Sequence, residues 1–127
     1  MQSFLLVGLG GGLGAMARYG VGLGVGRVWS GPVPLATLLV NISGSLAMGL
    51  LVGLLARYTP QWQAEARLLL AVGLFGGFTT FSAFSLDAVT LIERGNTGLA
   101  VTYALVSVVL SVLALFVGLW ITRSSGL

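Results

Sequence analysis

Long apolar runs separated by short polar connections dominate the pattern of this chain. A membrane-spanning helix needs about 20 mostly apolar residues, and four segments meet that length: residues 3–26, 33–56, 67–92 and 97–121. The connections between them carry residues that end helices, namely Pro32, Pro34, Thr59, Pro60, Gly95 and Asn96. The pattern predicts an all-α integral membrane protein, a single transmembrane domain over residues 1–127 with four helices.

The third segment carries, at its centre, residues that disfavour one continuous helix. Gly76 and Gly77 are adjacent, and each glycine weakens a helix by about 1 kcal/mol relative to alanine. Thr79 and Thr80 follow, and their hydroxyls can cap a helix that restarts after them. We therefore expect a break near residues 75–80. Broken helices at membrane depth mark ion and substrate sites, because freed carbonyls face cations and the new N-terminus faces anions.

Composition supports a membrane protein and excludes several classes of function. The chain is 57% hydrophobic and only 7% charged, whereas a soluble domain is about one quarter charged. Cysteine and histidine are absent, which removes disulfides, thiolate metal sites and the commonest general base. The only acids are Glu65, Asp87 and Glu93, and no two of them lie close in sequence. We therefore do not expect an enzyme, and six scattered arginines without a lysine offer no patch for nucleic acid.

The arginines give almost no preference for one orientation in the membrane. The apolar N-terminus lacks the charged start and cleavage site of a signal peptide, so we interpret it as mature sequence with four spans. Four spans put both termini on one side, with Arg57, Arg67 and Arg123; the other side has Arg27, Arg94 and, if it snorkels that way, Arg18. Because orientation follows the excess of basic residues near the helix ends, such a chain could insert both ways. We predict an antiparallel, dual-topology homodimer; the alternative is a weakly biased chain oriented by its partners.

Polar side chains form two stripes with a spacing of four residues, which places each stripe on one helical face. The stripes comprise Thr37, Asn41 and Ser45 in the second segment, and Tyr103, Ser107 and Ser111 in the fourth. Neutral hydroxyl and amide donors can solvate a dehydrated anion without trapping it. They can also simply join helices by hydrogen bonds of about 0.6–2 kcal/mol each. Both interpretations stay open, and the break beside the stripes favours a path for a small ion.

Four further side chains bear on such a path. Phe81 and Phe84 share a helical face, and their ring edges, which are electropositive, could contact an anion. Arg18 lies late in the first span; it either orients carbonyls near the break or snorkels to the membrane surface, and sequence alone favours snorkelling. Asp87 lies past the break, where we expect a vestibule.

Glycines spaced at four residues occur in the first three spans. This spacing lets helix backbones approach closely in lipid. It predicts packing at Gly10 and Gly14, Gly49 and Gly53, and Gly73 and Gly77, and also at Gly8 and Gly12, Gly20 and Gly24, and Gly22 and Gly26.

The whole chain resembles the Fluc (CrcB) family of fluoride channels. Three motifs carry the resemblance: G-G-x-x-G-A-x-x-R-Y at residues 10–19, V-N-x-x-G-S-x-x-x-G at residues 40–49, and G-G-F-T-T-F-S-A-F at residues 76–84. The third motif is the most specific. The chain departs from the family pattern at Ala83, where threonine is frequent, and at Leu46, where an aromatic residue is common.

The resemblance implies a dual-topology antiparallel dimer in the bacterial plasma (inner) membrane, with two pores that passively export fluoride. It implies a fluoride pathway at Asn41, Phe81, Phe84, Tyr103 and Ser107, with Ser111 and Thr37 beside them. It also implies a structural sodium ion at the dimer centre, held by backbone carbonyls of Gly76 and Thr79. Arg18, Gly77 and Thr80 would then be structural residues near the break.

Two other classes of protein remain to be distinguished from a channel. A small proton-coupled multidrug antiporter can also have four helices and dual topology, but it needs a membrane-embedded carboxylate, and the first two spans contain none. An accessory membrane protein without transport would explain the glycines but not the two polar stripes.

Overall fold

Four long helical rods make up the part of the chain that the computed structural model describes, residues 1–58 and 60–124. Three rods are single helices: α1 (Gln2–Val28), α2 (Leu35–Tyr58) and α6 (Thr97–Ser124). The other rod contains α3 (Gln63–Ala66), the π-helical η1 (Arg67–Phe75), α4 (Gly76–Phe78) and α5 (Phe81–Glu93). All four rods are long and apolar enough to cross a membrane. The all-helical, four-span fold predicted from the apolar pattern is confirmed, with helix ends that differ by a few residues.

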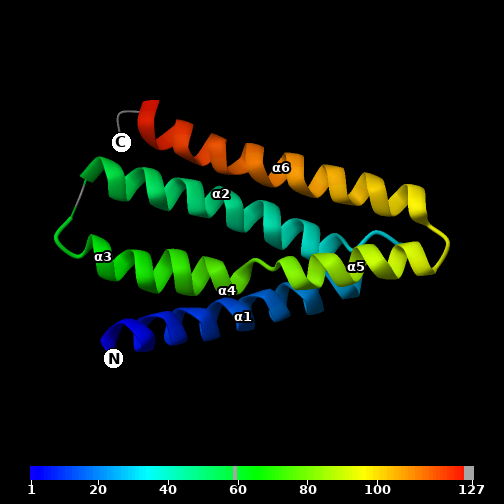
Figure 1. The fold of residues 1–127 in the computed structure, drawn as a ribbon, viewed down its shortest axis with the longest axis horizontal. Coiled ribbons are helices and arrows are strands. Elements are labelled where there is room, and N and C mark those ends of the chain that lie inside the picture. Colours follow the sequence, from blue (N-terminus) through cyan, green and yellow to red (C-terminus); the bar gives the residue numbers. More distant parts are fainter. Residues whose placement is uncertain (59, 125–127) are drawn as a thin grey trace.

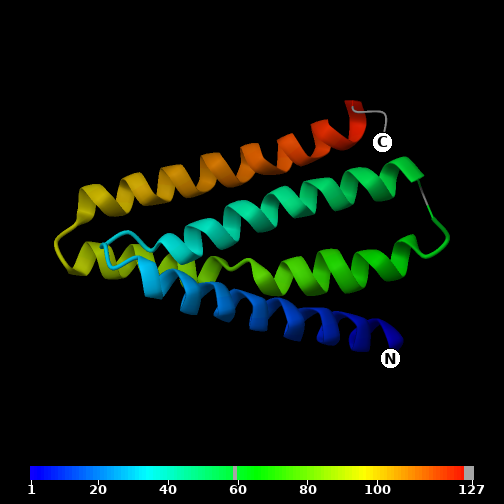
Figure 2. The same cartoon turned by 180° about the vertical axis from the view of Figure 1, so that it is seen from behind.

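The rods lie roughly side by side and alternate in direction along the chain (Figures 1 and 2). Both termini lie at one end of the bundle, together with the connection between α2 and α3 (Figure 1). The α1–α2 and α5–α6 connections lie at the other end, and Figure 2 shows the same arrangement from behind. The arginines near the helix ends therefore divide as expected, with Arg57, Arg67 and Arg123 at the end that carries the termini.

The backbone between α4 and α5 leaves the helical conformation at two residues. Thr79 (φ −82°, ψ 159°) and Thr80 (φ −154°, ψ 129°) are extended. The backbone N–H and the hydroxyl of Thr79 both donate to the carbonyl of Phe75, at 3.0 and 2.9 Å. The hydroxyl of Thr80 then caps α5 by accepting from the backbone N–H of Ala83 at 3.2 Å. Figure 1 shows this pair as a short non-helical link in the middle of the rod.

Gly76 and Gly77 do not themselves leave the helical conformation, although the sequence suggested that they disrupt the helix. Both belong to α4, and Gly76 has helical dihedral angles (φ −63°, ψ −40°). A Cβ on Gly77 would lie 2.5 Å from the carbonyl oxygen of Gly11 in α1. Gly77 is therefore required for close packing of α1 against α4, and the extended threonines alone make the link.

Two glycine-lined contacts hold the bundle in pairs. In the first pair, a Cβ on Gly14 of α1 would overlap the carbonyl oxygen of Leu74 in η1. In the second pair, a Cβ on Gly49 of α2 would overlap the carbonyl oxygen of Leu115 in α6. Backbones approach this closely only where side chains are absent. The same spacing does not mark close packing within this chain at Gly8 and Gly12 or over residues 20–26, because a Cβ on any of these glycines meets nothing within 4 Å.

Candidate functional site

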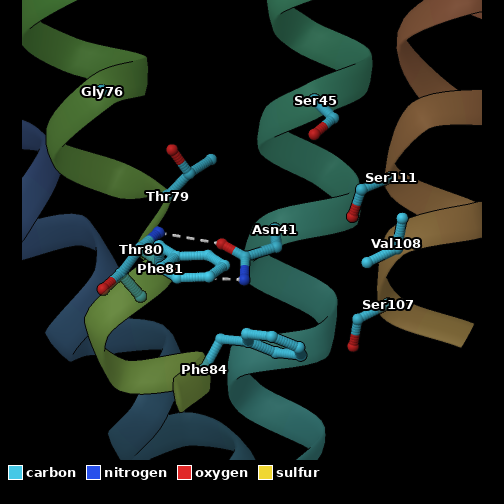
Figure 3. A pocket seen from close by; sticks show the side chains of 10 residues that line it. All are labelled: Asn41, Ser45, Gly76, Thr79, Thr80, Phe81, Phe84, Ser107, Val108 and Ser111. Atoms are coloured by element: carbon cyan, nitrogen blue, oxygen red, sulfur yellow. Dashed lines mark hydrogen bonds between the residues drawn. The ribbon is translucent and has the colours of Figure 1, made fainter. Parts of the chain in front are cut away.

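A cavity of about 370 Å³ opens beside the link, between α2, α5 and α6. Its lining consists of hydroxyl, amide, aromatic and small residues without an ionisable side chain, as Figure 3 shows: Asn41, Ser45, Gly76, Thr79, Thr80, Phe81, Phe84, Ser107, Val108 and Ser111. Seven of the residues predicted to form a pathway or a cation site, and Thr80, therefore come together here. The cavity is uncharged, and its few hydroxyl and amide groups lie in a largely apolar lining.

Asn41 connects α2 to the link through both ends of its amide (Figure 3). Its Oδ1 accepts from the backbone N–H of Thr80 at 2.9 Å, and its Nδ2 donates to the carbonyl of Thr80 at 3.1 Å. This pair of bonds satisfies backbone groups that the extended conformation takes out of the helix. An amide nitrogen has two hydrogens, so one N–H of Asn41 remains for another acceptor.

Ser107 and Ser111 present the hydroxyls of α6 to the same cavity (Figure 3). Ser107 is only 5% exposed, and its Oγ has no partner at hydrogen-bond distance among the described residues. Serine hydroxyls in helices commonly bond the carbonyl one turn back, as Ser43 bonds Leu39 at 2.7 Å. Ser107 is thus a buried donor in contact with the cavity, and leaving it unmatched costs about 1–3 kcal/mol.

Three aromatic rings form a row along one side of the cavity. The ring centroids of Phe81 and Phe84 are 5.6 Å apart, and those of Phe84 and Tyr103 are 5.2 Å apart, both in tilted geometry. Phe81 is 77% exposed, whereas Tyr103 is buried in a cluster with Leu91. The hydroxyl of Tyr103 donates to the carboxylate of Asp87 at 3.4 Å. Tyr103 is therefore the buried end of the row, and only Phe81 and Phe84 line the cavity itself.

Thr37 and Arg18 lie on a second cavity, of about 410 Å³, between α1, α2 and α5. Thr37 is thereby separated from Asn41 and Ser45, although the three share a stripe in the sequence.

The sequence alone favoured snorkelling of Arg18 to the membrane surface, but the structure shows a different contact. The Nε of Arg18 donates to the carbonyl of Gly77 at 3.2 Å, so the alternative, that it orients a carbonyl near the break, is the correct one. Ala83 also lines this second cavity, so that departure from the family pattern does not alter the first.

The carbonyls around the link divide into two groups. Phe75 accepts from Thr79, and Gly77 accepts from Arg18. No hydrogen bond is assigned to the carbonyls of Gly76 and Thr79 in the described part of the chain, because the N–H of Thr80 bonds Asn41 instead of Gly76. Carbonyl oxygens are suitable ligands for a hard cation. The described residues contain no group of three or more acidic side chains that could hold a metal, so a cation at this position would be bound by neutral oxygens such as these carbonyls.

The site contains two features that the sequence analysis did not assign to it. Ser45 belongs to the predicted stripe of α2 and lines the cavity beside Asn41. The backbone of Thr80, rather than an ion, occupies two of the hydrogen-bonding groups of Asn41. The spacing of Ser45 was a sufficient signal for the first feature, whereas the second depends on how α2 packs against the link.

Comparison with known proteins gives one family. Residues 5–119 match the family model described as CrcB-like protein, Camphor Resistance (CrcB). The fluoride-specific ion channel FluC of Hyphomonas neptunium is 55% identical over 123 residues, which are 97% of each chain. The proteins of the same name from Mesorhizobium japonicum and Chelativorans sp. are 51% and 53% identical over 124 residues, 98% of each chain.

Proposed function

This chain belongs to the CrcB-like protein family, and on that premise we propose that it is a fluoride-selective channel that exports the ion passively from the bacterial cytoplasm. Its family and its four spans make it a multi-pass membrane protein and a channel, not an enzyme. The names of the relatives support the choice of ion. The single observation in this chain that carries the proposal is the uncharged cavity with the unmatched hydroxyl of Ser107.

A cavity of this kind suits a small anion that has lost its water. The hydroxyls of Ser107 and Ser111 and the remaining N–H of Asn41 are donors that could replace that water. They carry no full positive charge, so an ion bound to them can also leave. Bonding to fluoride would also remove the cost of the unmatched Ser107 hydroxyl.

The row of rings extends the proposed path beyond the serines. Ring edges carry partial positive charge, and Phe81 and Phe84 both line the cavity. We place the ion first among the donors of α2 and α6 and then at the edges of these two rings. Tyr103 and Asp87 border its exit, where their contact places a hydroxyl and a carboxylate.

The proposed assembly is an antiparallel homodimer with two pores. Arg18 contacts a carbonyl inside the bundle, so three arginines at one end face two at the other, and this small difference supports insertion both ways up. The exposure of Phe81 supports a second copy beside the cavity, because an ion path needs both sides of that ring enclosed.

A central sodium ion is part of the same proposal. The residues present are suited to it, because the carbonyls of Gly76 and Thr79 accept no hydrogen bond from the residues that the structure describes. Bound there, the ion would supply positive charge that joins the two links of the dimer. Asn41 and Arg18 would keep the carbonyls in place by holding Thr80 and Gly77.

Reconstitution into liposomes tests the proposed function. Liposomes loaded with potassium fluoride should release fluoride, measured with an electrode, when valinomycin balances the charge. Matched liposomes loaded with chloride should release little. Equal release of both anions, or no release of fluoride, would contradict the proposal. Proton-driven uptake of a cationic drug without fluoride release would instead identify the antiporter alternative.

A further inference from the structure

A separate cavity of about 290 Å³ lies between the C-terminal ends of α2 and α6. It is lined by Gly53, Ala56 and Arg57 of α2 and by Thr122 and Arg123 of α6. A Cβ on Gly53 would overlap the hydroxyl of Thr122, so this glycine lets the two helix ends close around a buried threonine. The closure places the two arginines on the lining of one cavity.

The positions of the lining residues at the helix ends lead us to expect this cavity at the depth of the lipid headgroups. Arg57 and Arg123 are each the penultimate residue of a helix that is long and apolar enough to span the membrane. Tyr58, which follows Arg57, and Trp120, three residues before Arg123, are exposed, and tyrosine and tryptophan are enriched at the two membrane surfaces. The lining residues therefore meet the headgroup region.

The guanidinium groups of Arg57 and Arg123 have more N–H donors than are hydrogen-bonded to the described residues. Nη1 of Arg57 donates to the carbonyl of Thr122 at 2.8 Å, and its guanidinium lies 5.8 Å from the ring centroid of Tyr58. These contacts fix Arg57 in place but use few of its five N–H groups. Within residues 1–58 and 60–124 no carboxylate pairs with either arginine. The helix dipole accounts for a basic residue at the C-terminal end of each helix. It does not account for two arginines that line the same cavity.

We propose that this cavity binds the phosphate of an anionic phospholipid. Guanidinium groups bind phosphate oxygens through parallel hydrogen bonds, and basic pockets between transmembrane helices bind lipid headgroups. A lipid fits better than a free phosphate ion because apolar surface continues from the cavity toward the membrane centre. Leu54 and Trp120, each three residues before one of the arginines, are exposed on the same helical faces. The acyl chains of a lipid can cover them.

Native mass spectrometry of the full chain in detergent, titrated with phosphatidylglycerol, tests the proposal. We expect retained phosphatidylglycerol on the wild type and at least tenfold weaker retention on Arg57→Gln/Arg123→Gln, since each basic residue contributes to anionic-lipid binding. The matched control is Arg27→Gln/Arg94→Gln, which removes the same charge at the opposite end. It should retain the lipid as the wild type does.

Two additions keep the test decisive. Among residues 1–58 and 60–124 no hydrogen bond involves the side chain of Arg123, so Arg123→Gln alone should weaken lipid retention without lowering the melting temperature. Phosphatidylcholine and glycerol phosphate replace the lipid in parallel titrations, and neither should be retained at the same concentration. Equal losses in both double variants, no loss in either, or binding of glycerol phosphate as tight as that of the lipid would overturn the proposal.

Discussion

Asn41 is the residue on which the geometry of the link depends most directly. It replaces, with two side-chain bonds, the helical partners that the backbone of Thr80 lacks. We expect Asn41→Asp to lower stability by about 1–3 kcal/mol, because the new carboxylate oxygen would face the carbonyl of Thr80 where Nδ2 now donates. Thermal unfolding in detergent measures this change. Ser43→Ala, in the same helix, should unfold like the wild type because its hydroxyl bonds only carbonyls of α2. Equal melting temperatures for Asn41→Asp and the wild type would contradict this role.

A substitution at Ser107 can distinguish a role of this residue in ion conduction from a role in helix packing. Its buried hydroxyl has no partner at hydrogen-bond distance in the described chain, so Ser107→Ala removes an unmatched group and should not lower the melting temperature. If the hydroxyl bonds a desolvated fluoride, its loss should slow efflux about ten- to hundredfold, since hydrogen bonds to charged groups contribute about 1.5–3 kcal/mol. Efflux from liposomes is the measurement, with Ser43→Ala as the control. If efflux falls equally in Ser107→Ala and Ser43→Ala, the effect is not specific to the Ser107 hydroxyl, and its proposed contact with fluoride is contradicted.

At the scale of elements, glycine positions determine which helices pack closely. We expect Gly14→Ala to destabilise the protein, because its Cβ would overlap the carbonyl oxygen of Leu74 and force α1 away from η1. Gly8→Ala, in the same helix, meets nothing within 4 Å and should be neutral or slightly stabilising, since alanine favours a helix by about 1 kcal/mol. Thermal unfolding of both variants distinguishes them. A similar loss in both would mean that Gly8 packs against something outside this chain.

The elements themselves were predictable because their signal is local. Four apolar runs of sufficient length specify four spans, and the hydroxyls of Thr79 and Thr80 mark the residues at which the helix stops and starts again. Packing was not predictable to the same degree. Gly14 and Gly8 carry the same spacing signal, yet only Gly14 touches another helix, because the rotation of α1 decides which face is covered.

Tertiary contacts explain the remaining differences at the site. The chemistry of Arg18 permits snorkelling, and only the approach of α1 to α4 brings the carbonyl of Gly77 within its reach. Thr37 shares a helical face with Asn41 by spacing, but α2 crosses the link between them, so they border different cavities. Residue types and spacing therefore gave the chemistry of the candidate site, and helix crossings determined which of its residues meet.

At the scale of the whole molecule, the near balance of arginines at the two ends leads to a prediction about orientation. Gln61 lies at the end that carries the termini and Asn96 at the opposite end, and both are exposed. Gln61→Lys should favour insertion with the termini inside, and Asn96→Lys the reverse, because basic residues beside short loops remain cytoplasmic. An antiparallel dimer needs both orientations. Each variant alone should therefore give less fluoride efflux from cells than the wild type, and the two expressed together should restore it.

The orientation of each variant can be measured directly because the chain contains no cysteine. A single cysteine introduced at Glu93 or at Glu65, exposed at opposite ends, reports which end an impermeant maleimide reaches from outside the cell. In the wild type both positions should be labelled in part. If each lysine variant is labelled at one end only and yet exports fluoride as fast as the wild type, copies of a single orientation suffice. The antiparallel dimer would then be wrong, while a fluoride path through the cavity of each chain would remain possible to test with Ser107→Ala.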